Sequence, residues 1–282
     1  MRVGAFSPIV VYLVSAVLGV VFGIGATRLA TLLPRRYGIT HVPSAENVRL
    51  RNLALVVLTT ACSAGIASIV LEWPEATVAR GGLWFSVTLV LVTSLLAAAA
   101  IDLEHMILPN EVTLGGTIVA LAFSLTRPTG IRVALAGALL GGVIAYLLPF
   151  LYRKIRGRSG AGGGDAKLTL LVGAWHGASG VFFVLLAAAL QQIVVAIGMR
   201  AFKISMPLPE SVKAELAELR ERAANGDAEA KELLADDPMA AELEGDGVGS
   251  VRLPFGPFLV LACLEFLFAR TTILSWFAWL AS

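Results

Sequence analysis

The chain has 282 residues, of which 57% are hydrophobic and 15% charged, whereas soluble domains carry about 25% charged residues. With a mean hydropathy of +0.81, this composition excludes an ordinary soluble enzyme. The 22 Lys and Arg side chains nearly balance the 20 Asp and Glu side chains, so no nucleic-acid partner is expected. Twelve of the acids lie between Arg200 and Arg252, which leaves a basic and apolar remainder typical of a polytopic membrane protein.

Long apolar segments follow one another along the chain. A helix needs about 20 apolar residues to cross a bilayer core of about 30 Å, because no backbone polar group can stay unpaired in lipid. We expect an all-α polytopic membrane protein with about eight transmembrane helices, one of which, Ala166–Trp175, is too short to cross alone. The other expected segments are Pro8–Leu29, Leu53–Leu71, Leu83–Ile101, Val112–Leu125, Arg132–Leu151, Val181–Met199 and Gly256–Leu280.

Two short loops, Pro34–Asn52 and Tyr152–Ser159, are rich in Lys and Arg, and such loops stay in the cytoplasm. Four predicted helices lie between these loops, so both can lie on the same side of the membrane. If Ala166–Trp175 and its neighbours cross the membrane, Arg200–Arg252 is also cytoplasmic, whereas a re-entrant Ala166–Trp175 places that segment on the other side. Basic residues at both ends of the segment favour the cytoplasm.

The acidic segment differs in composition from the rest of the chain. Ser211–Ala224 repeats apolar and charged residues at helical spacing, Asn225-Gly226-Asp227 is typical of a helix stop followed by a new cap, and Ala228–Ala235 continues as helix. The sequence thus predicts a small cytoplasmic helical insert at 200–252, either a solvated connector or a docking surface. It separates a membrane core at 53–199 from a last transmembrane helix at 253–282, and 1–52 forms an N-terminal helix and basic loop.

Carboxylates near a membrane interior need an explanation, because an Asp at the centre of a transmembrane helix costs about 2.5–3.5 kcal/mol on insertion scales. Asp102 ends the alanine-rich apolar run before it, and Asp165 follows a stretch made of glycine and alanine. By the loop count, both lie at the cytoplasmic edge. Two carboxylates brought together cannot both ionise cheaply, so one keeps a proton while the other acts as a base. Such a pair can activate water against a peptide carbonyl, although either aspartate alone could instead be a helix N-cap.

Three motifs occur in a fixed order and carry a resemblance to a known family. They are Asp102 with Leu108-Pro109-Asn110 and Thr113, then Gly162-Gly163-Gly164-Asp165-Ala166-Lys167-Leu168, then Leu253-Pro254-Phe255-Gly256-Pro257. Across Leu83–Leu280 the chain resembles the prepilin peptidases, the type IV leader peptidases of the GxGD aspartic class.

The resemblance implies a peptidase of the inner membrane whose active site faces the cytoplasm. It would remove the basic leader from type IV prepilins or type II secretion pseudopilins, and it could contact pilus or secretion assembly components. Asp102 and Asp165 would be the catalytic pair, with neither a metal nor a cofactor required for proteolysis. The residues expected to bind substrate or to support the pair are Gly162, Gly164, Lys167, Glu104, Pro109, Pro254 and Gly256.

Several of these side chains have a second reading. Lys167 could instead extend to the membrane interface, and Glu104 with His105 could face lipid headgroups. Glu265 lies inside the last apolar segment, where an acid is a functional candidate, and we expect its partner on another helix. His176 is expected in a loop.

The N-terminal part departs from the resemblance. Bifunctional members carry a Gly-Ser-Phe-Leu-Asn-Val-type stretch that ends in Arg-Leu-Pro and precedes a loop with two Cys-x-x-Cys pairs. The loop Pro34–Asn52 has no cysteine, so no zinc site is expected there, and His41 alone cannot replace one. Methylation of the new N-terminus from S-adenosylmethionine stays open. Gly19, Arg28 and Leu29 match this pattern, while Gly23 and Ala30 replace its Asn and Pro.

Two rival functions also fit the composition. A proton-coupled transporter would use the same intramembrane carboxylates to move protons. However, the sequence shows no inverted repeat, and the aspartates are expected at one face and not at the midplane. A membrane anchor for a pilus or secretion assembly would make Arg200–Arg252 the active part.

Overall fold

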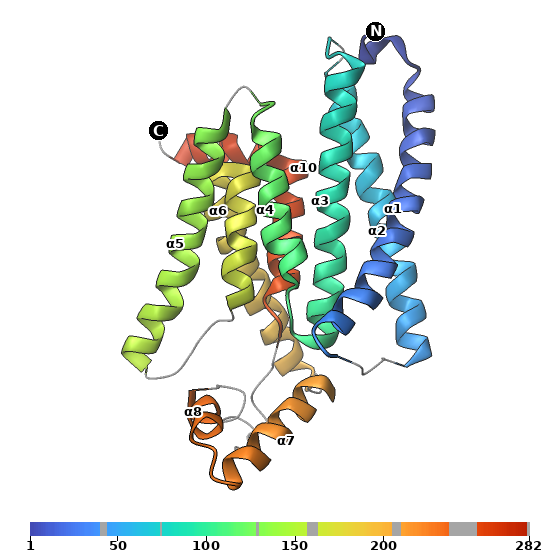
Figure 1. Ribbon diagram of the computed structural model, residues 1–282. Helices are drawn as coiled ribbons and strands as arrows, with labels where there is room; N and C mark the ends of the chain where they lie inside the picture. The colour runs from blue at the N-terminus through green and yellow to red at the C-terminus, as the bar shows by residue number, and fades with distance from the viewer. Residues whose placement is uncertain are drawn as a thin grey trace.

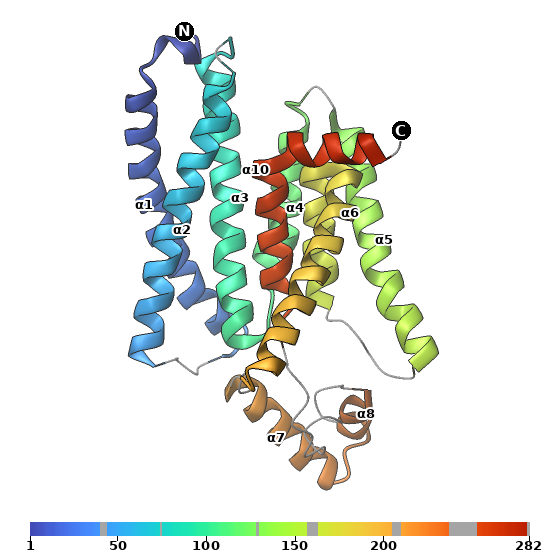
Figure 2. The ribbon, with the colours of Figure 1, turned by 180° about the vertical axis from the view of Figure 1, so that it is seen from behind.

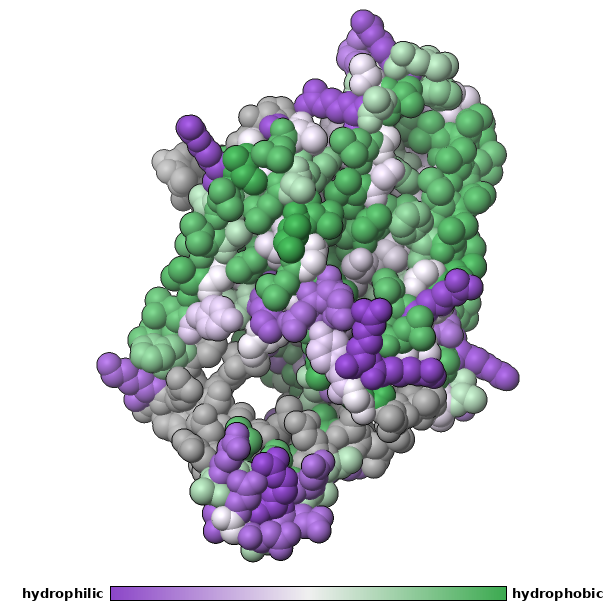
Figure 3. Space-filling view, viewed as in Figure 1, coloured by the Kyte–Doolittle hydropathy of each residue, from purple (hydrophilic) through white to green (hydrophobic). Residues whose placement is uncertain are grey.

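The computed structural model describes residues 1–39, 44–73, 75–127, 130–156, 163–204, 210–236 and 253–280, and within these ranges its regular elements are helices. Figure 3 shows an apolar surface over the middle of the bundle, with hydrophilic residues toward its two ends. The prediction of an all-α polytopic membrane protein is confirmed. Among the described residues, six helices are long and apolar enough to cross a membrane. They are α1 (Pro8–Arg36), α2 (Ala45–Leu71), α3 (Val78–His105), α5 (Gly130–Arg156), α6 (Gly163–Ala201) and α10 (Gly256–Leu280).

Six helices that meet the length criterion are fewer than the expected eight transmembrane helices, for two reasons. First, α4 (Asn110–Ser124) has only 15 residues. Second, α6 reverses direction at Gly177, whose φ of 76° and ψ of −170° suit only glycine. Thr169 and Val181 would lie about 18 Å apart along a straight helix, yet both border Gly141 of α5.

The two arms of α6 therefore run in opposite directions, as Figures 1 and 2 show. The first arm contains the predicted segment Ala166–Trp175, and the second contains Val181–Met199. The first arm runs away from the end where the insert lies, and the second arm returns to that end (Figure 1). The short segment is thus one half of a helical hairpin.

Glycines let α5 and α6 approach closely. A Cβ added at Gly137 would collide with the carbonyl oxygen of Gly173, and a Cβ added at Gly173 would collide with that of Gly137. Gly141 lies four residues after Gly137, on the same helix face, and borders the Thr169 carbonyl. Small residues at this spacing allow the close backbone contact that holds membrane helices together.

Replacing Gly173 by Ala is expected to lower the free energy of unfolding by about 1–3 kcal/mol, because the added methyl group overpacks this contact. Thermal unfolding of the purified chain in detergent measures the effect. The matched control is Gly198→Ala on the second arm of α6, where a Cβ would meet nothing within 4 Å. Equal melting temperatures for the two variants would contradict the close contact.

The predicted last transmembrane helix, Gly256–Leu280, does not continue straight. Its backbone leaves helical geometry at Ala269 (φ −110°, ψ 18°), and the remainder turns across the ends of α6 and α5 (Figure 2). Arg270 follows directly after the bend. The bend therefore places this charged residue at the end of the bundle, where a guanidinium group avoids the cost of the membrane interior.

The predicted helical hairpin of the insert is confirmed by α7 (Glu210–Ala224) and α8 (Ala228–Asp236). Between them Gly226 has a φ of 95°. Asp227 then caps α8, because its Oδ1 accepts hydrogen bonds from the backbone nitrogens of Glu229 at 3.0 Å and Ala230 at 3.2 Å. The N-terminus and the end of α10 lie at the end of the bundle opposite the insert (Figure 1).

Candidate active site

Asp102 lies in the last turns of α3 and is buried, with 5% of its surface exposed. Met106 closes the helix in the left-handed conformation, and its backbone nitrogen donates to the Asp102 carbonyl oxygen at 2.9 Å. Pro109 then disfavours helical geometry for Leu108, so the chain stays non-helical until α4 begins at Asn110. Asp102 is therefore inside a helix near its C-terminus, and the alternative that it is an N-cap is wrong.

The side chain of Asp102 meets the N-terminus of α10. The backbone nitrogen of Gly256, the first residue of α10, donates to Asp102 Oδ2 at 3.1 Å. This nitrogen has no partner within its own helix, and the partial positive charge of a helix N-terminus favours a carboxylate there. A Cβ at Gly256 would lie only 2.5 Å from Asp102 Oδ2. The contact thus requires glycine at this position.

Asp165 lies in the first turn of α6, again at a helix N-terminus. Asp165 and Asp102 lie near the same residue, Leu108, because Gly164, next to Asp165, and Gly256, hydrogen-bonded to Asp102, both border it. Leu108 packs against the starts of both α6 and α10, because Cβ atoms placed on Gly164 and on Gly256 would each lie 3.1 Å from its side chain. The structure therefore brings the end of α3 and the starts of α6 and α10 together.

A polar chain extends from this place toward α1. Lys167 Nζ donates to Asn110 Oδ1 at 2.9 Å, next to Pro109 at the start of α4. The backbone nitrogen of Asn110 donates to Tyr37 Oη at 2.8 Å, and Tyr37 Oη donates to Glu111 Oε2 at 2.9 Å. Lys167 therefore reaches the start of α4. Sequence reasoning missed Tyr37, because one tyrosine beside a basic loop gives no distinctive signal.

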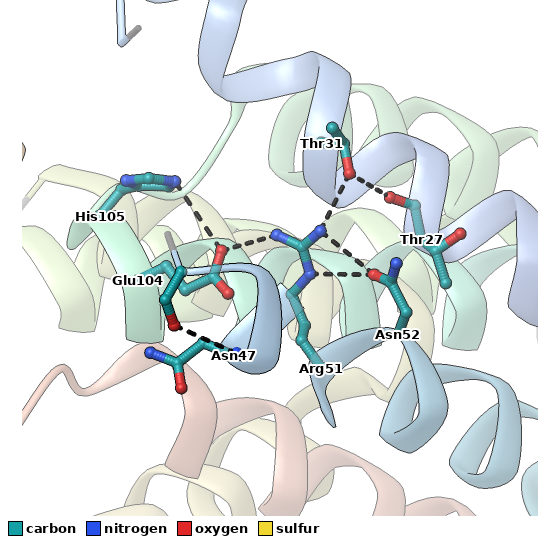
Figure 4. A network of polar contacts seen from close by, with 8 residues as sticks. Thr27, Thr31, Asn47, Arg51, Asn52, Glu104 and His105 are labelled. Carbon is teal, nitrogen blue, oxygen red and sulfur yellow. Dashed lines mark hydrogen bonds and ion pairs between the residues drawn. The ribbon is translucent and has the colours of Figure 1, made fainter. Parts of the chain in front are cut away.

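Glu104 is held by Arg51 of α2 (Figure 4). The Glu104 Oε2 and Arg51 Nη1 atoms lie 2.7 Å apart, and their side chains are only 17% and 8% exposed. Arg51 also donates to Thr31 Oγ1 of α1 at 2.9 Å and to Asn52 Oδ1 at 3.1 Å. His105 Nε2 lies 3.9 Å from Glu104 Oε2 and is buried. The alternative that Glu104 and His105 face headgroups is therefore wrong, and the network joins three helices beside Asp102.

Replacing Arg51 by Met is expected to lower the free energy of unfolding by about 1–3 kcal/mol, because it removes the guanidinium partner of Glu104, whose side chain is only 17% exposed. The double variant Arg51→Met/Glu104→Met is expected to recover most of that loss. Thermal melts in detergent measure both, with exposed Arg49→Met as the control on the same helix. Strictly additive losses in the two single variants and the double variant would show that the pair is not coupled.

The remaining predicted residues lie outside this cluster or at its edge. Glu265 has its partner on another helix, as predicted, because Gln191 Nε2 donates to its Oε2 at 2.8 Å. Gln192 Nε2 donates to the Leu253 carbonyl oxygen at 3.1 Å, directly before Pro254. The predicted residues Gly162 and His41 lie outside the described residues.

The expectation that His176 lies in a loop is wrong. The side chain is buried at the bend of α6, where its ring stacks on that of Trp175 at a centroid distance of 4.6 Å. Its Nε2 lies 3.4 Å from Cys263 Sγ. The aromatic residues around it were visible in the sequence, but nothing local to His176 indicated that α10 would cover it.

The chemistry of the site is that of carboxylates and backbone donors. In the part of the chain that the structure describes, no three His, Cys, Asp or Glu side chains gather as metal ligands. Instead, the N-terminus of α10 donates to the buried Asp102, and Asp165 lies in the first turn of α6. Fold and site together define a polytopic membrane protein with paired aspartates at one end of its helices.

Comparison with known proteins finds similarity over the part of the chain that holds the two aspartates. Residues 89–197, which include both aspartates, match the model of the type IV leader peptidase family, so this part of the chain is similar to that family. Relatives named prepilin leader peptidase/N-methyltransferase include one from Pectobacterium carotovorum subsp. carotovorum, 32% identical over 124 residues, or 43% of this chain and 44% of the relative. Another, from Neisseria gonorrhoeae, is 35% identical over 119 residues, or 41% of each chain.

The similarity covers only part of the relatives. The chain spans about half the length or less of the curated relatives it matches. For the relative from Stutzerimonas stutzeri, the match covers 50% of that protein. No solved structure matches the chain.

Proposed function

We propose that the chain is a membrane aspartic endopeptidase that removes the leader peptide of type IV prepilins or type II secretion pseudopilins. The observation that carries the proposal is the meeting of Asp102 and Asp165 at the N-termini of α10 and α6, within the region that matches the leader peptidase family. Lys167 and the glycines Gly164 and Gly256 would support the pair, because these glycines let the starts of α6 and α10 pack closely against Leu108 and Asp102.

In the proposed mechanism the two carboxylates share one proton and hold a water molecule between them, because two adjacent carboxylates do not both ionise cheaply. One aspartate takes a proton from the water as it attacks the peptide carbonyl. The other donates its proton to the carbonyl oxygen. As the tetrahedral intermediate collapses, the aspartate that took the proton from water gives it to the leaving amine, and the other aspartate takes a proton back from the hydroxyl group, so the pair again shares one proton. The helix N-termini would hold negative charge at the pair. No covalent intermediate is required.

The proposed location is the inner membrane, with the site facing the cytoplasm. The bundle end that holds Asp102 also carries Arg35 and Arg36 at the end of α1 and Arg49 at the start of α2, and such clusters stay in the cytoplasm. A prepilin would place its apolar helix in the bilayer and its basic leader in the cytosol, within reach of the pair. The insert, at the same end (Figure 1), could dock secretion or pilus components.

The second activity in the relatives' name, methylation, has less support here. Gly19 and Gly23, in the stretch compared with the bifunctional members, pack onto α2, where Cβ atoms would lie 2.6 Å from Thr60 Cα and 2.7 Å from Val56 Cα. That stretch fits a helix contact better than a site for S-adenosylmethionine. The proposed function is therefore the peptidase, and the product mass in the test below decides whether the chain also methylates the new N-terminus.

The test expresses the full chain in a bacterial strain that lacks its own prepilin peptidase and supplies a tagged prepilin. Conversion of the prepilin to a band shortened by its leader supports the proposal, and unprocessed prepilin at normal levels of the chain overturns it. The mass of the purified product shows separately whether a methyl group has been added. Deleting residues 211–236 tests the role of the insert. If the chain is a peptidase, the deletion variant should still cleave the prepilin. If the insert is the active part of an assembly scaffold, the deletion variant should no longer support assembly.

A further inference from the structure

A second site lies at the opposite end of the bundle from the aspartates. A cavity of about 520 Å³ lies between the end of α2, the start of α3, the end of α4 and the bends of α6 and α10. Arg80 in its wall and Asp102 are 22 residues apart on α3, which is about 33 Å along the helix. The cavity is thus about one bilayer thickness from the proposed active site, and its volume is typical of ligand pockets.

Positive charge gathers in this cavity. Arg80 in the first turn of α3, Arg127 after the end of α4 and Arg270 after the bend of α10 line it, together with one acid, Glu72. Within the described residues, no carboxylate lies within 4.0 Å of any of these three guanidinium groups. The wall therefore offers several cationic groups whose charge is not neutralised by a partner in the described chain.

Arg127 is held in a fixed place. Its Nη1 donates to the Trp175 carbonyl oxygen at 2.6 Å, and its Cζ lies 4.7 Å from the centroid of the Phe123 ring. Burial, with the nearby charge of Arg270, lowers the pKa of Arg127 to about 10, so the folded chain bears a cost for keeping this group charged. An anion bound between the two guanidinium groups would offset that cost.

The walls are also suited to an amphiphile. Trp73 and Trp84 pack edge to face at 5.0 Å in the cavity wall, and Trp175 lines another side. Tryptophan prefers the level of lipid headgroups, where one part of the ring is apolar and the other is hydrated.

We propose that this cavity binds a phosphate-bearing anion between Arg127 and Arg270, supplied by the headgroup of an anionic phospholipid or by free phosphate. Arginine suits this ligand, because its planar guanidinium donates paired hydrogen bonds to phosphate oxygens.

The experiment titrates the purified full chain in dodecyl maltoside with dihexanoyl phosphatidylglycerol, dihexanoyl phosphatidylcholine or inorganic phosphate, and follows tryptophan fluorescence. A saturable change with phosphatidylglycerol that phosphatidylcholine does not reproduce is expected. Saturation with phosphatidylglycerol alone identifies the headgroup as the source, while equal saturation with inorganic phosphate identifies the free anion. No saturable response to either, or an equal response to phosphatidylcholine, would overturn the proposal.

Variants make the test specific. Arg270→Gln is expected to weaken binding at least 10-fold, whereas Arg132→Gln, an exposed arginine in α5 outside the cavity wall, should leave it unchanged. Arg270 is preferred to Arg127, because Arg127→Gln would also remove the hydrogen bond to the Trp175 carbonyl. Thermal melts without ligand establish that both variants fold. Unchanged affinity in a folded Arg270→Gln protein would refute the site.

Discussion

Replacing either Asp102 or Asp165 by Asn is expected to lower kcat/KM for prepilin cleavage by at least about 10³-fold, within the range that a general acid or base contributes. Asparagine keeps the shape of the side chain but can neither accept nor release a proton at neutral pH. Because both carboxylates are needed for one proton relay, the double variant is expected to be no slower than the slower single variant. Steady-state cleavage by purified variants in detergent measures all three.

The matched control is Asp227→Asn, which removes a carboxylate from the cap of α8 and not from the membrane bundle. This variant should cleave at the wild-type rate. Equal expression and equal melting temperatures would show that the Asp102 and Asp165 variants fold. Wild-type cleavage by either of those variants would remove the pair from the mechanism.

Gly256→Ala is expected to abolish most cleavage while the chain still folds. A methyl group at Gly256 would lie 2.5 Å from Asp102 Oδ2 and 3.1 Å from Leu108 Cδ2, so the carboxylate must move out of its hydrogen bond with the start of α10. Displacing a catalytic group by about 1 Å can cost about 10²-fold in rate. The kcat of the purified variant on a prepilin measures this effect.

Alanine variants of the two glycines before Asp165 serve as comparisons for Gly256→Ala. A Cβ at Gly164 would lie 3.1 Å from the Leu108 side chain, which can give way, and a Cβ at Gly163 would meet nothing within 4 Å. Activity should therefore fall in the order Gly163→Ala, Gly164→Ala, Gly256→Ala, with the first near wild type. If Gly256→Ala were as active as Gly163→Ala, the contact between α10 and Asp102 would have no part in the reaction.

Much of the fold could be predicted from local sequence. The apolar segments predicted the membrane helices, and Asn225-Gly226-Asp227 predicted the break between α7 and α8, because caps and turns depend on neighbouring residues. The reversal at Gly177 could not be predicted from local sequence, since the residues around Gly173 and Gly180 are of similar types. Which glycine adopts the unusual conformation depends on packing against α5, a contact between distant parts of the chain.

In the candidate site, too, some residues could be predicted from local sequence and others could not. Asp102 and Asp165 stand out in the sequence, because acids at the ends of apolar segments are costly and therefore unusual. The partners of those acids do not stand out. In the sequence Arg51 looks like any other residue of a short basic loop, and only the approach of α2 to α3 places its guanidinium on Glu104. Pairing across helices leaves no periodic signal in either helix.

The most direct test of the central claim, that Asp102 and Asp165 together cleave a prepilin, is the product mass after incubating a purified prepilin with the purified chain. The wild-type protein is expected to give a product shortened by the leader, and Asp165→Asn is expected to leave the prepilin intact. An intact prepilin with folded wild-type protein, or the same shortened product with Asp165→Asn, would contradict the claim.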